Sequence, residues 1–229
     1  EERRVNWEIL DAWRDAAADT GIPKIAEFNR GDNSGNAYFQ MNQRRGSRWS
    51  ATKAFLDPAK ARHNLTILTE CHVQKLILDN TSGEKRCTGI EVRTKKGIET
   101  FTATREVLLS AGSIGSPQIL QLSGVGNGEM LKQRGVAPAH ELPGVGENLQ
   151  DHLQVRTIYK VSNTVTLNQR VHSLFGLAAM GIEYFLRKTG PLTMRPPRLA
   201  PSAKSVKNHP PPNIQRHANP LSPKNSANP

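Results

Sequence analysis

The sequence predicts a mixed α/β fold, in which helices and antiparallel strands are combined in the α+β manner. Three observations support this class. Apolar residues recur at helical spacing between Trp7 and Gly21. Between residues 65 and 110 the pattern changes to short β-rich runs separated by turn residues. The last of these runs passes through small residues into helix-forming sequence, which allows a ligand to approach backbone amides at a helix N-terminus.

The first helix is expected over residues 7–21, where charged residues alternate with an apolar face that contains Trp7, Ile9, Leu10 and Trp13. Gly21 suits the left-handed cap of this helix, and Pro23 just beyond it prevents continuation. Residues 29–36 have the composition of a loop. A second, short helix is expected over residues 50–61.

Five strands are expected in the middle of the chain, at residues 65–69, 73–79, 88–94, 99–103 and 106–110. The segments 80–83 and 95–97 carry residues typical of hairpin turns, so neighbouring strands should pair antiparallel. The strand at 106–110 leads through Ala111 and Gly112 into a helix over residues 114–122. Two glycine-rich loops follow, at 123–128 and 143–148, with a short helix between them.

The last third of the chain changes in character. A strand is expected at 155–161, and an amphipathic helix at 172–188 that ends at Gly190 and Pro191. Nine of the 15 prolines fall in residues 195–229, and hydrophobic periodicity is lost there. This composition predicts a mostly unstructured tail.

The formal net charge of +11 is unevenly distributed. The tail holds no acidic residue and six basic ones, which are Arg195, Arg198, Lys204, Lys207, Arg216 and Lys224. About +5 therefore remains for the body, a weaker indication of a polyanion partner than the total suggests. The chain has no RNA-binding signature and no zinc-ligand spacing, so nucleic acid is not the expected partner. A basic protein that binds a polyanion through its tail is kept as the alternative function.

Cysteine usage and hydropathy indicate a cytoplasmic protein, with peripheral membrane association left open. Cys71 and Cys87 are the only cysteines, and they are interpreted as reduced thiols in strand-like segments. No apolar run reaches the roughly 20 residues that a membrane-spanning helix needs, so no transmembrane segment is expected.

One stretch resembles a family signature at every constrained position. Residues 112–126, which read GSIGSPQILQLSGVG, are similar to the second signature of the glucose–methanol–choline (GMC) oxidoreductases. Other segments match in the expected order, at residues 45–51, 55–56, 64–65, 69–73, 76–77 and 143–152. The resemblance covers residues 7–194 approximately, and it is nearest to the choline-dehydrogenase-like branch.

The resemblance implies an FAD-binding α/β domain and a substrate domain with an antiparallel sheet and helices. Residues 1–152 would be a partial FAD-binding domain, 153–194 the start of the substrate domain, and 195–229 a degenerate tail. The family oxidises the CH–OH group of a small-molecule alcohol by hydride transfer to flavin, and oxygen or a quinone-type carrier then accepts the electrons. Cofactor contact is expected at Val73, on the adenine side, and at Ser110, Ala111 and Gly112.

Two expected parts of the family do not match. The sequence contains no GxGxxG motif to hold the FAD pyrophosphate, and no residue matches the catalytic histidine. His152 follows Asp151, but neighbouring residues of an extended segment point to opposite faces, so a structural role in a loop is expected instead of a catalytic pair. The chain begins at Glu1 and is expected to be an internal piece that is inactive alone. A truncated pseudoenzyme that folds poorly is the third interpretation.

Overall fold

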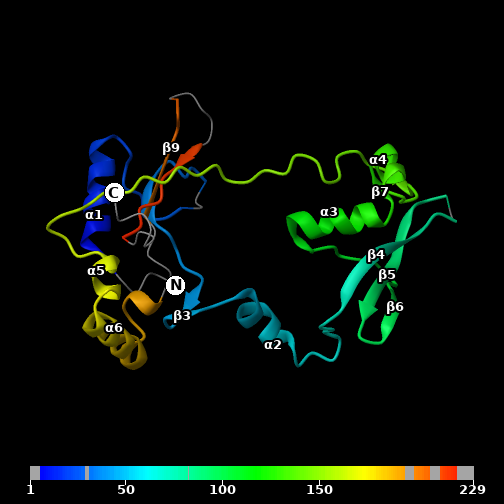
Figure 1. The fold of residues 1–229 in the computed structure, drawn as a ribbon, viewed down its shortest axis with the longest axis horizontal. Helices are drawn as coiled ribbons and strands as arrows, with labels where there is room; N and C mark the ends of the chain where they lie inside the picture. Colours follow the sequence, from blue (N-terminus) through cyan, green and yellow to red (C-terminus); the bar gives the residue numbers. More distant parts are fainter. Residues whose placement is uncertain (1–5, 29–30, 82, 194–198, 207–211, 221–229) are drawn as a thin grey trace. The chain divides into compact units, whose positions relative to one another are not determined.

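The computed structural model describes residues 6–28, 31–81, 83–193, 199–206 and 212–220. Its internal contacts divide the chain into two compact units. One unit combines the residues up to 62 with those from 156 onward, and the other consists of residues 63–155. Figure 1 shows the elements of both, coloured along the sequence.

Helix α1 (Glu8–Asp19) opens the first unit and confirms the first predicted helix. It buries Leu10 and Ala17, which are seven residues apart and so lie on one face after two turns. The helix ends at Thr20, where the N–H of Gly21 bonds to Ala18 O and Gly21 takes a φ of +88°. The expected helix at 50–61 is a π-helix, η1 (Thr52–Leu56), followed by the short α2 (Asp57–Ala59).

A three-stranded antiparallel sheet is the centre of the first unit. Its strand order is β1 (Gly35–Tyr38), β9 (Leu199–Ala203) and β10 (Ile214–Gln215). A small hairpin joins β2 (Gln43–Arg44) to β3 (Ser47–Arg48), and Arg45 and Gly46 both have positive φ in its turn. Two-residue turns of this kind match the twist of the strands they connect.

Strands β9 and β10 correct the prediction of an unstructured tail for the residues described there. Leu199 and Ala200 are fully buried, and β9 pairs with β1 from Gly35↔Ser202 to Tyr38↔Leu199. Pro201 has no N–H, but its carbonyl accepts a hydrogen bond from Arg216 N at 3.0 Å. The partner strand lies more than 160 positions away along the sequence, so the local composition of the tail carried no sign of it.

The helices that follow complete the core of the first unit. They are α5 (Leu167–Val171), α6 (Leu174–Arg187) and the 3-10 turn η2 (Pro191–Thr193). In α6, which confirms the predicted helix at 172–188, the Ser173 hydroxyl accepts a bond from Gly176 N at 3.2 Å. The buried core cluster joins α1, α5, α6 and β9 through Trp7, Leu10, Leu167, Met180 and Leu199.

The second unit is built on an antiparallel meander of β4 (His72–Asp79), β5 (Arg86–Thr94) and β6 (Gly97–Thr102). These strands confirm three of the five predicted in this region. The unit also contains α3 (Gly112–Leu122), α4 (Gly128–Gln133), and the short parallel pair β7 (Val125–Gly126) and β8 (His140–Glu141). Helix α3 packs against β4.

Three predicted strands, at 65–69, 106–110 and 155–161, are not strands in the structure. Each has strand-like composition, but none pairs with another described segment. The apolar run at 107–109 is typical of a strand buried in a parallel sheet, yet Leu108 is 80% exposed. Composition predicted a preference for extended backbone, and the pairing partner that converts this into a strand is not among the described elements.

The predicted domain limits stay a prediction. The expected boundary after residue 152 lies close to the change of unit after 155, but residues up to 62 group with those from 156 onward instead of with 63–155. Within the described residues, no helix is both long and apolar enough to cross a bilayer.

Candidate functional site

Val73, expected on the adenine side of the cofactor, is the second residue of β4. It is half-buried and pairs with Val92 of β5, and a register irregularity follows between Val73 and Lys75. Strand β4 lies at the edge of its sheet, so one side of its backbone has no strand partner in the described structure. An open strand edge next to a bulge can offer backbone groups to a flat heteroaromatic ring.

Ser110 and Ala111 directly precede α3, Gly112 is its first residue, and all three are exposed. Gly112 has a φ of +84°, and a Cβ placed on it would meet no atom within 4 Å, so its backbone is open on that side. The N–H of Ala111 donates to Ser116 Oγ at 3.0 Å. The first turn of α3 has no acidic residue and no side-chain cap, which leaves N–H groups for a polar or anionic ligand.

Helix α3 and strand β4, which carry these residues, are joined by one side chain. Ser123, the residue after α3, accepts a hydrogen bond from Leu76 N at 2.7 Å and donates one to Ile119 O at 2.5 Å. No described hydrogen bond links Val73 directly to Ser110, Ala111 or Gly112. That the four residues contact a single cofactor therefore stays a prediction.

The neighbouring pair Asp151 and His152 is not a catalytic dyad. The Asp151 carboxylate accepts a bond from the backbone N–H of His152 at 2.7 Å, not from its imidazole. Both residues are exposed and lie outside regular structure. In the described part of the chain, no group of three or more His, Cys, Asp and Glu side chains is arranged to hold a metal ion.

The sequence interpretation missed a cavity of about 750 Å³ in the first unit. It lies between the end of α1, the start of β1 and the ends of β9 and β10, and its charged lining residues are Asp32, Lys204 and Arg216. Ser34 lowers the pKa of Asp32, since its backbone N–H donates to Asp32 Oδ1 at 2.8 Å, and the charge of Lys204 adds a smaller effect in the same direction. No motif predicted this cavity, because its walls are far apart in the sequence.

Comparison with known proteins places the chain in a family. A family model described as GMC oxidoreductase matches residues 2–154. The oxygen-dependent choline dehydrogenase of Photobacterium profundum is 38% identical over 182 residues, which are 80% of this chain and 31% of that protein. The chain thus spans about a third of the length of the curated relatives it matches.

Solved structures agree with this placement. Pyridoxine 4-oxidase from Mesorbium loti is 33% identical with a TM-score of 0.59, over 65% of this chain and 28% of the other. A fungal aryl-alcohol oxidase shares the fold with a TM-score of 0.75 at 24% identity, over 86% of this chain and 34% of the other. The family model covers more than half of the 229 residues, as the resemblance of residues 112–126 predicted. The chain belongs to the GMC oxidoreductase family.

Proposed function

We propose that this chain supplies part of the flavin-binding domain of an FAD-dependent oxidoreductase that oxidises the CH–OH group of a small alcohol. The observation that carries the proposal is the family match over residues 2–154. That range includes the open edge of β4 and the uncapped start of α3. A GMC family match and a backbone suited to ligand approach coincide on the same residues.

The residues present fit such a cofactor. The backbone of Val73, at the sheet edge, would hold the adenine side, and the small residues Ser110, Ala111 and Gly112 would let the cofactor approach the start of α3. When bound, FAD accepts a hydride from the alcohol carbon. The role of these four residues is to bind and orient the cofactor, and no catalytic base is assigned to this chain.

A polypeptide of these 229 residues alone is proposed to be inactive. It contains no GxGxxG motif for the pyrophosphate, and no residue of the sequence matches the catalytic histidine of the family. Choline is the substrate named for the bacterial relatives, with oxygen as the acceptor. For this chain we propose an alcohol of that kind, with oxygen or a quinone-type carrier as the acceptor, in a cytoplasmic enzyme. The comparisons do not support a polyanion-binding function.

A chimera tests the proposal. Residues 2–154 would replace the matching segment of the Photobacterium profundum choline dehydrogenase, and the purified chimera would be examined by absorbance for bound flavin. We expect stoichiometric flavin in the chimera and none in the 229-residue chain. Flavin retained by the 229-residue chain would show that the GxGxxG unit is dispensable.

The position of the cofactor is tested by adding bulk at the start of α3. Ala111→Trp in the chimera should abolish flavin binding, because the indole would occupy the space at the start of α3 that we assign to the cofactor. The variant should still fold, since Ala111 is exposed and its φ of −88° tolerates any side chain. Ala137→Trp is the matched control, since Ala137 is exposed in the same unit. Full flavin occupancy in the Ala111→Trp chimera contradicts the proposal. Absence of flavin from the folded chimera that carries no substitution contradicts it as well.

A further inference from the structure

The cavity of the first unit is a broad hollow that is open to solvent. Four segments form its walls, namely residues 20–23, residues 32–35 apart from Asn33, residues 202–204, and Arg216. Its volume of about 750 Å³ lies within the range of small-molecule sites. All of its walls belong to one unit.

Backbone hydrogen bonds hold the walls together. Asn36 is fully buried, and its backbone carbonyl accepts a hydrogen bond from Ile25 N at 3.1 Å. Its backbone N–H donates to Pro23 O at 2.8 Å, and its side-chain Nδ2 donates to Ile22 O at 2.7 Å. Strand β1 then pairs with β9 at Gly35↔Ser202, and Arg216 N donates to Pro201 O. These bonds connect the backbone of residues 22–25, the start of β1, β9 and the residue after β10.

The charges that line the cavity are mainly positive. Lys204 and Arg216 are exposed and form no ion pair within 4.0 Å with another described residue, although the charge of Lys204 acts on Asp32 from a longer distance. Asp32 is the acidic residue of the lining, and its Oδ1 accepts Ser34 N at 2.8 Å. Lys24 lies next to Pro23, but its ammonium is paired with Asp15. The cavity therefore combines two cationic groups with one carboxylate that is already hydrogen-bonded by a neighbour.

The uncharged part of the lining includes three hydroxyl-bearing residues, which are Thr20, Ser34 and Ser202. The Thr20 hydroxyl already donates its proton to Ala17 O at 2.8 Å, which leaves Ser34 and Ser202 as the hydroxyls that face a ligand. No aromatic side chain is among the described lining residues, whereas a quaternary ammonium ligand is usually enclosed by aromatic rings. Guanidinium and ammonium groups beside hydroxyls are the donors that bind carboxylate and phosphate.

We propose that this cavity binds the carboxylate or phosphate group of a small molecule, with Lys204 and Arg216 as its cationic ligands. This inference goes beyond the oxidoreductase role and does not depend on it, because binding needs neither flavin nor turnover. The ligand proposed for this cavity is an anion and so is distinct from the alcohol substrate proposed above, because the lining carries two cationic groups and no described aromatic residue.

The experiment is a titration of the 229-residue chain, followed by NMR and calorimetry, with inorganic phosphate, malonate and choline as separate probes. We expect saturable binding of phosphate or malonate, with shifts in the amides of Gly35 and Ser202, and no saturation by choline. The variant Lys204→Gln/Arg216→Gln should bind the anion about tenfold more weakly, because it loses two exposed charges that each contribute modestly to binding. Which anion saturates at lower concentration distinguishes the carboxylate from the phosphate.

Lys96→Gln is the matched control, because Lys96 is an exposed lysine in the β5–β6 turn of the other unit. It should leave anion binding unchanged. Lys204→Gln alone repeats the test if the double variant does not fold, since this exposed side chain has no described hydrogen bond. Equal anion affinity in wild type and either cavity variant, or saturation of the cavity by choline, overturns the proposal. Failure here leaves the flavin chimera result unaffected.

Discussion

Replacing Ser123 by alanine should loosen the attachment of α3 to β4. The Ser123 hydroxyl accepts Leu76 N at 2.7 Å across 47 positions of sequence and is itself held by Ile119 O. Alanine leaves the Leu76 N–H without its partner on the open edge of the sheet. For a partly buried donor we expect a cost of about 1–2 kcal/mol in the free energy of opening.

Amide hydrogen exchange measures this effect at the residue concerned. A cost of about 1–2 kcal/mol corresponds to roughly five- to thirtyfold faster exchange at Leu76. Ser113→Ala is the control, because Ser113 lies in the same helix, is exposed and makes no described hydrogen bond. If Leu76 exchanges at the same rate in Ser123→Ala and in wild type, the bond does not attach the helix to the sheet.

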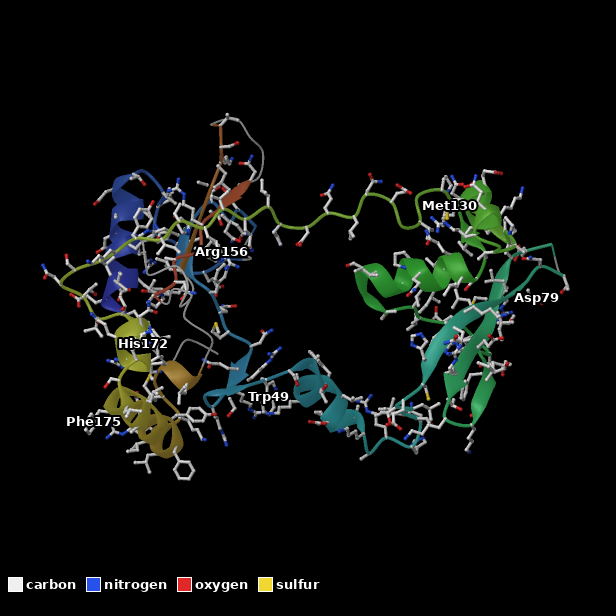
Figure 2. All side chains as sticks on the ribbon, viewed as in Figure 1. Trp49, Asp79, Met130, Arg156, His172 and Phe175 are labelled. Carbon is white, nitrogen blue, oxygen red and sulfur yellow. The ribbon has the colours of Figure 1, made fainter. Side chains whose placement is uncertain are left out.

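Two further perturbations test the two units separately. Leu10→Ala should destabilise the first unit by about 3 kcal/mol in urea unfolding, because Leu10 is 2% exposed in the main core cluster. The control Leu174→Ala, at an exposed site, should cost under about 0.5 kcal/mol. Equal losses of stability in the two variants would refute the assignment of Leu10 to the core. Asp79, labelled in Figure 2, has a lowered pKa because its carboxylate accepts the backbone N–H and then the hydroxyl of Thr81. Its stabilising contribution is thus present above roughly pH 4 and is lost as pH falls through the folded-state pKa. The stability difference between wild type and Asp79→Asn should shrink over that fall, and a difference independent of pH would contradict the assignment.

The elements that the sequence predicted well are those stabilised by local interactions. Helix α1 has its apolar spacing, its glycine and its proline within 17 residues, from Trp7 to Pro23. The meander of β4, β5 and β6 depends on two short turns, one of which the Asp79 carboxylate stabilises. In both cases the residues that determine the structure are neighbours in the sequence, so a pattern of a few positions was sufficient.

The elements that failed depend on distant partners. Strand β9 was missed because its pairing with β1 cannot be inferred from Pro-rich composition. The cavity at Lys204 and Arg216 was missed for the same reason, since β9 and β10 place these residues beside the end of α1. The prediction of a strand at 106–110 was wrong for the converse reason, because the local pattern is present and the distant partner is not among the described segments. Its composition suits a buried strand, but no described segment pairs with it.

Unburied apolar surface supports the proposal that this chain acts as part of a longer enzyme. Helix α6 buries Met180 but leaves its opposite face apolar and exposed, including Phe175, labelled in Figure 2, at 90% exposure and Phe185 at 80%. In the other unit, α3 has no buried residue, although its sequence is mainly apolar. An exposed apolar face of the kind seen on α6 is usually covered by another chain segment or by a partner. The match covers 31% of the choline dehydrogenase relative from Photobacterium profundum. We propose that, in a full-length family member, residues outside the matched segment cover α3 and pair with the run at 106–110.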